Sequence, residues 1–107
     1  GIFADNNHSA DGVARAIAEQ NLHNRIIVTA YDSDPEEVAA IKSGAIKAIM
    51  VQDPYGMGYK GVDSAVKAIE GATLPAYVDT GVVIVEQHNV NDPASQGILD
   101  PFTLKKY

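Results

Sequence analysis

The sequence predicts an α/β domain with a parallel sheet and flanking helices. Its 107 residues are 46% apolar and 21% charged, a balance typical of a chain that packs a core. Short runs rich in β-branched residues, such as residues 26–31, are typical of strands covered on both faces. Amphipathic helical patterns alternate with these runs, and that order favours parallel strands joined by right-handed crossovers.

The first half of the chain predicts two strands and two helices. A strand is expected at residues 1–4, an amphipathic helix at 9–22 and a buried strand at 26–31. The second helix is expected to begin at "SDPEE", with Asp34 as its N-cap and Glu37 completing a capping box. Gly44 is suited to end it.

The second half continues the alternation. A strand is expected at residues 46–51, a helix at 57–70, a strand at 80–85 and a short helix at 93–99. The helix at 57–70 carries an apolar stripe that we expect to be buried, formed by Val62, Ala65, Val66 and Ile69. The predicted order is therefore β-α-β-α-β-α-β, followed by a weakly patterned tail.

Composition excludes several function classes. The net charge is −6 and no Lys/Arg cluster offsets it, so nucleic acid is not an expected partner. Cysteine is absent, which excludes disulfides and thiolate chemistry. The three histidines lack the spacing of metal ligands, and we expect neither a metal nor a cofactor. No apolar run approaches the roughly 20 residues that span a bilayer.

Polar side chains stand where the first three strands end: Asn6, Asp32 and Gln52. Ligands of parallel α/β sheets bind at the carboxyl ends of the strands. A carboxylate accepts hydrogen bonds and an amide both donates and accepts, a mixture that suits a neutral polyol. Asn6, Asn7 and Asp32 can also be explained as helix caps or turn residues. Gln52 is harder to explain that way, because Gln caps helices poorly.

Enzymatic motifs are missing from the sequence. It contains no G-x-G-x-x-G, no phosphate-binding loop and no nucleophile elbow. Asp5 and Asp32 resemble a catalytic carboxylate pair, but the sequence pattern indicates no environment that would perturb their pKa values. We predict no catalytic residue and no enzymatic activity.

Three stretches resemble a known family: "IFADNNHSADGVARAI", "IIVTAYDSDPEEVAAIKSGAIKAIMVQDPYGMGYKGVDSAVKAI" and "DTGVVIV". They are similar to the C-terminal part of ribose-type sugar-binding proteins, the type I periplasmic solute-binding proteins of ABC transporters. The resemblance covers residues 2–90. It implies part of a type I periplasmic-binding-protein fold, in which sugar is enclosed between two flavodoxin-like lobes.

The resemblance implies that the same three residues contact the sugar. Asn6 matches the Asn of the "F-A-x-N" turn, and Asp32 matches the Asp of the "G-F-D" turn, with Ala30 in place of Gly. Gln52 matches the Gln where the chain crosses between lobes. The implied function is sugar binding for uptake, with a membrane permease as partner and a periplasmic or extracellular location.

The resemblance also divides the chain. Residues 1–51 would be the second half of the C-terminal lobe, 52–79 the closing segment of the N-terminal lobe, and 80–107 the returning crossing strand and tail. The chain opens inside an expected strand without a Met, which indicates a fragment of a longer protein. We expect it to associate with the missing N-terminal part or to form a dimer that covers its exposed apolar faces.

Two alternatives remain open. The effector domain of a lactose-repressor-type transcription regulator shares the fold, although such regulators often have a basic residue where Val51 precedes Gln52. A phospho-receiver using Asp32 would need an acidic pair after the first strand and a Lys after a later one, and the sequence offers neither clearly.

Overall fold

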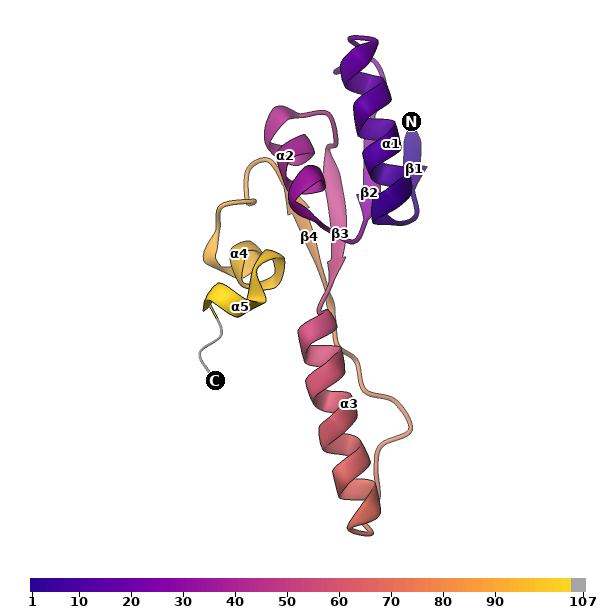
Figure 1. Cartoon of the computed structure of the whole chain (residues 1–107), viewed down its shortest axis with the longest axis vertical. Coiled ribbons are helices and arrows are strands. Elements are labelled where there is room, and N and C mark those ends of the chain that lie inside the picture. Colours follow the sequence, from indigo (N-terminus) through magenta and orange to yellow (C-terminus); the bar gives the residue numbers. More distant parts are fainter. Residues whose placement is uncertain (105–107) are drawn as a thin grey trace.

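The computed structural model describes residues 1–104 and shows one sheet flanked by helices, with one long helix apart from it (Figure 1). The strands are β1 (Ile2–Ala4), β2 (Val28–Tyr31), β3 (Ala48–Gln52) and β4 (Val82–Glu86). The helices are α1 (Asn7–Glu19), α2 (Pro35–Ser43), α3 (Pro54–Ile69), α4 (Pro93–Leu99) and α5 (Pro101–Leu104). Within this range no helix is both long and apolar enough to cross a bilayer.

The sheet has the strand order β1-β2-β3-β4. β1 and β2 pair in parallel, as do β2 and β3, which confirms the expected parallel sheet for these strands. β4 pairs antiparallel to β3, so the expectation of a fourth parallel strand is wrong. The reason is the path of the chain: α3 leaves the end of β3 and points away from the sheet (Figure 1). Residues 70–81 return to that same end, and Gln52 pairs with Val82 there.

The core lies between the sheet and the helices α1, α2 and α4. One row of residues crosses all strands in register and is buried, formed by Ala4, Ala30, Ile49 and Val85. α1 contacts β1 and β2, α2 contacts β3, and α4 contacts β3 and β4. On α1 the buried positions are Ala10 and Ile17, which are two helical turns apart on one face. The amphipathic pattern expected for the first helix is thus confirmed.

α3 has no buried residue, so the expected burial of its apolar stripe is wrong for this chain. Val62 is 68% exposed and Ile69 is 87% exposed. The chain measures 58 × 26 × 17 Å, and its radius of gyration of 16.8 Å exceeds the roughly 13 Å of a compact domain of this length. Periodicity identifies a helix face that favours burial, but it does not say whether the covering residues belong to the same chain.

Capping residues define the helix ends. Asn6 caps α1 in a capping box with Ser9, and α1 therefore begins at Asn7, two residues before the expected start. The Asp34 side chain accepts hydrogen bonds from the backbone N–H groups of Glu36 and Glu37, which confirms it as the cap of α2. The Glu37 carboxylate makes no hydrogen bond in return, so the predicted capping box is only half formed. Gly44 ends α2 in the left-handed conformation, with φ 81°, as expected.

Candidate functional site

Asp32 occupies a left-handed turn directly after β2, with φ 71°. Asp and Asn tolerate this conformation better than most side chains with a Cβ atom. Its backbone N–H donates to the Met50 carbonyl oxygen at 2.8 Å, which anchors the turn to β3. The carboxylate is therefore held at the carboxyl end of the sheet by a conformation that few other residues adopt.

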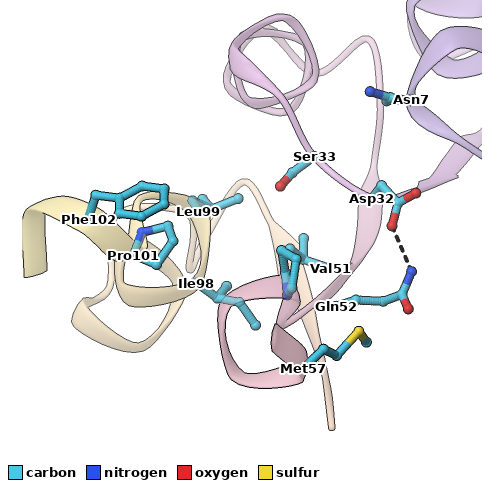
Figure 2. Close-up of a pocket in the computed structure, with 11 residues that line it drawn as sticks. Asn7, Asp32, Ser33, Val51, Gln52, Met57, Ile98, Leu99, Pro101 and Phe102 are labelled. Carbon is cyan, nitrogen blue, oxygen red and sulfur yellow. Dashed lines mark hydrogen bonds between the residues drawn. The ribbon is translucent and has the colours of Figure 1, made fainter. Parts of the chain in front are cut away.

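Gln52 is the last residue of β3, and its side chain lies beside Asp32. Gln52 Nε2 donates a hydrogen bond to Asp32 Oδ1 at 2.9 Å (Figure 2). Both residues are half-buried. No further hydrogen bond to either side chain is found among residues 1–102, so Asp32 Oδ2 and Gln52 Oε1 have no hydrogen-bond partner in that range. Two of the three predicted site residues thus form a hydrogen-bonded pair.

Asn6 has the capping role that the alternative interpretation assigned to it. Its Oδ1 accepts from the Ser9 backbone N–H at 2.9 Å, and its Nδ2 donates to Asp5 Oδ1 at 3.1 Å. The amide keeps a second lone pair and a second N–H, so capping does not exhaust its hydrogen-bonding capacity. Its neighbour Asn7, predicted only as a cap or turn residue, lines the pocket described next.

A pocket of about 480 Å³ adjoins the Asp32–Gln52 pair. Figure 2 shows Met57, at the start of α3, near Gln52, while α4 and α5 form the opposite wall. The lining residues are Asn7, Asp32, Ser33, Val51, Gln52, Pro54, Met57, Ile98, Leu99, Pro101 and Phe102. Sequence reasoning gave no role to the wall from α4 and α5, although "GILDPF" is the most apolar stretch of the tail.

The lining combines polar atoms at one side with apolar side chains elsewhere. None of these lining residues is Lys or Arg, and the one charged group among them is the Asp32 carboxylate. An anionic ligand such as a phosphate would meet repulsion there. A neutral ligand with hydroxyl groups could donate to Asp32 and exchange hydrogen bonds with Gln52.

The model of the "Periplasmic binding protein domain" family matches residues 1–73. The ribose import binding protein of Salmonella typhimurium is 33% identical over 85 residues, which are 78% of this chain and 28% of that protein. The ribose import binding protein of Haemophilus influenzae is 29% identical over 86 residues, which are 80% of this chain and 29% of the relative.

Solved structures of solute-binding proteins are also similar to this chain. A carbohydrate transporter solute-binding protein from Agrobacterium radiobacter, in complex with D-arabinose, superposes with a TM-score of 0.88 and 41% identity over 94% of this chain and 34% of its own. An ABC transporter solute-binding protein from Agrobacterium vitis with bound D-fucose superposes with a TM-score of 0.87 and 32% identity. The match covers 92% of this chain and 34% of that protein. A Brachyspira murdochii protein described as "ABC transporter, LacI family transcriptional regulator" superposes with a TM-score of 0.76 and 25% identity. The match covers 92% of this chain and 34% of that protein.

The family match extends over more than half of the chain, and the fold match over nearly all of it. The chain spans about a third or less of the length of these relatives. The chain belongs to the periplasmic binding protein domain family.

Proposed function

We propose that this chain is part of a solute-binding protein that binds a monosaccharide for uptake through an ABC transporter. The observation that carries the proposal is the Asp32–Gln52 pair at the carboxyl ends of neighbouring strands. It supports sugar binding because the pair lies where parallel α/β sheets bind ligands, and because related structures hold D-arabinose and D-fucose.

The chemistry of the pair fits a sugar ring. A sugar hydroxyl donates and accepts at once, so it can donate to Asp32 Oδ2 while it accepts from a Gln52 N–H. The hydrogen bond between the two side chains fixes both before ligand arrives, which lowers the entropy lost on binding. A hydrogen bond to an ionised carboxylate contributes about 1.5–3 kcal/mol.

The division of the chain that the sequence predicts is part of the proposal. Residues 1–51 and 80–107 would belong to one lobe and its crossing strand, and 52–79 to the other lobe. The exposed apolar stripe of α3 supports this, because it needs a covering surface that residues 1–104 do not provide. Asn6, Asp32 and Gln52 would then contact sugar from one side, and the segment outside this chain would complete the site.

The mechanism would be conformational and not catalytic. Sugar bound between two lobes stabilises the closed form by its differential affinity for the closed and open states. The closed form would dock on a membrane permease, in the periplasm or at the outer face of the cell.

The test uses the complete protein, meaning the longer chain of which these residues are part. Asp32→Asn removes the charge, but Asn also adopts the left-handed conformation and can still accept from Gln52 Nε2. We expect calorimetric titration with D-ribose, D-arabinose and D-fucose to show at least about tenfold weaker binding than in wild type. Asp63→Asn, on the outer part of α3, serves as the matched control. An unchanged affinity in Asp32→Asn would remove Asp32 from the site.

A second candidate function is the effector domain of a transcription regulator, favoured by the Brachyspira murdochii neighbour. The same side chains would then recognise an inducer. The coding sequence upstream of Gly1 separates the two: an export signal followed by a first lobe supports the transport protein, and a helix-turn-helix segment supports the regulator.

A further inference from the structure

Three carboxylates converge between α1 and α2, outside the lining of the pocket described above. Asp11 comes from α1, Asp34 is the N-cap of α2, and Glu37 lies in the first turn of α2. One oxygen of each lies within 4.8 Å of the others. We call these three residues the carboxylate cluster.

Glu37 is the unusual member of the cluster. It is fully buried, with 0% of its surface exposed, and neither carboxylate oxygen has a hydrogen-bond partner among residues 1–102. Asp11 Oδ1 is buried and without a partner in the same part of the chain. Burial, then the nearby Asp34 charge, raise the pKa of Glu37 to about 7. Buried carboxylates in native proteins are normally paired, hydrogen-bonded or bound to a metal, so this one requires an explanation.

The described side chains supply no cation to the cluster. Arg15 lines a groove of about 240 Å³ beside it, together with Asp11, Ala14, Glu36 and Ala39. Arg15 forms no ion pair with Asp11 or Glu37 in the described structure, where the ion pairs are Lys67–Asp63 and His88–Glu86. Asp11 is the cluster member that lines this groove, so the groove adjoins the cluster at Asp11.

We propose that Asp11, Asp34 and Glu37 bind one hard divalent cation, calcium in the first place. All ligand atoms would be carboxylate oxygens, which hard cations prefer. Calcium accepts carboxylate oxygens in a flexible geometry, whereas magnesium demands a near-ideal octahedron and keeps several waters, so three carboxylates placed by two helices suit calcium better. Asp34 Oδ1 already accepts two backbone N–H groups, which leaves Oδ2 for the ion.

Such an ion would join α1 to the start of α2. Its ligand Asp34, the N-cap of α2, lies two residues beyond Asp32. Its three ligands are carboxylates on two helices, and without the ion an ionised Glu37 is repelled by Asp34 and Asp11. The ion would therefore stabilise the packing of α1 against α2. This role is separate from sugar binding, because no cluster residue lines the pocket beside Gln52.

The experiment measures calcium and magnesium binding by calorimetry and thermal unfolding, using the complete protein after removal of metal with EGTA. We expect calcium to bind and to raise the unfolding midpoint of wild type. Glu37→Gln and Asp11→Asn should each weaken calcium binding at least tenfold. Asp34→Asn should do the same while it keeps the helix cap, since Asn caps as well as Asp. Asp63→Asn, outside the cluster, should bind calcium as wild type does.

Three results would overturn the proposal. The first is wild type without calcium-dependent heat or midpoint change. The second is an equal calcium response in Glu37→Gln, which would indicate general screening of the −6 net charge. The third is calcium binding by Arg15→Gln but not by wild type, which would make the Arg15 guanidinium the counter-ion of the cluster.

Discussion

Residues 1–51 and the segment formed by α3 and residues 70–81 carry similar apolar patterns but differ in what covers them. In the first region α1 and α2 bury their apolar faces on the sheet, and Ile49 is 0% exposed. In the second region, α3 buries no residue and Ile69 is 87% exposed. An amphipathic pattern therefore predicts that a face becomes covered, but not by which part of a protein.

The difference begins at Gln52. Up to that residue each helix returns along the sheet, so the next strand can pair in parallel. After it, α3 continues away from the end of β3 (Figure 1), and the chain comes back antiparallel. The first region can thus be stabilised by its own contacts, whereas α3 buries none of its residues against the rest of the described chain.

The largest predicted effect concerns the core of the first region. Ile49→Ala should lower the free energy of unfolding by about 2–5 kcal/mol, because it opens a cavity beneath α2 and α4. Ile69→Ala in the same 107-residue chain should change it by less than about 0.5 kcal/mol. Urea unfolding followed by circular dichroism measures both. Equal losses in the two variants would contradict the contrast between the regions.

The second prediction concerns the buried charge of Glu37 in metal-free protein. Its pKa is about 7 in the folded state against 4.5 in the unfolded state, mainly because of burial and then Asp34. The stability it contributes is full below pH 4.5 and is lost as the pH rises to about 7, since the unfolded state releases the proton first.

Relative to Glu37→Gln, the free energy of unfolding of wild type should therefore fall by up to about 3 kcal/mol between pH 4 and pH 8. Urea midpoints across this range, with a chelator present, provide the measurement. Parallel pH profiles for the two proteins would show that the Glu37 carboxylate is better solvated or paired than the structure indicates.

The third prediction asks what covers α3. If another part of the complete protein packs on the apolar stripe, Val66→Ala should cost about 1–2 kcal/mol there, for the loss of two buried methyl groups. The same change in the 107-residue chain should have little effect, because Val66 is 48% exposed. A negligible effect in both proteins would show that the stripe stays in solvent.

The smallest effect is expected for the Lys67–Asp63 ion pair on α3. The hydrogen bond and the charge of Asp63 raise the pKa of Lys67, but both side chains are largely exposed and water screens the pair. Lys67→Ala should leave the unfolding midpoint unchanged within error. A clear loss in the 107-residue chain would mean that α3 is stabilised by local pairs more than we infer.

Much of the fold could be predicted because its signals are local. α2 begins after Asp34, with Pro35 in its first turn, and ends at Gly44, as expected. α4 also has the predicted bounds. The expected start of α3, at residue 57, lies three residues after the observed start at Pro54. Asp53–Pro54 repeats the cap arrangement of α2, and Asp53 Oδ1 accepts from the Gly56 N–H at 2.9 Å. The expected start at residue 57 takes no account of this cap.

The candidate site could be predicted only in part. The Asp32–Gln52 pair follows from strand ends and register, which the sequence pattern indicates. The wall formed by α4 and α5 depends on where the tail packs, and no local pattern defines that. Histidine spacing, on which the expectation of no metal rests, does not reveal the carboxylate cluster, because Asp11 and Glu37 meet only when α1 packs on α2.

One titration tests the central claim most directly. The complete protein and the 107-residue chain would each be titrated calorimetrically with D-ribose, D-arabinose and D-fucose. The account predicts that the complete protein binds a monosaccharide with one-to-one stoichiometry. It also predicts that the chain alone binds it at least about 100-fold more weakly, because in the proposed site Asp32 and Gln52 would form only one side. Failure of the complete protein to bind any monosaccharide, or equal affinity for the two proteins, would contradict it.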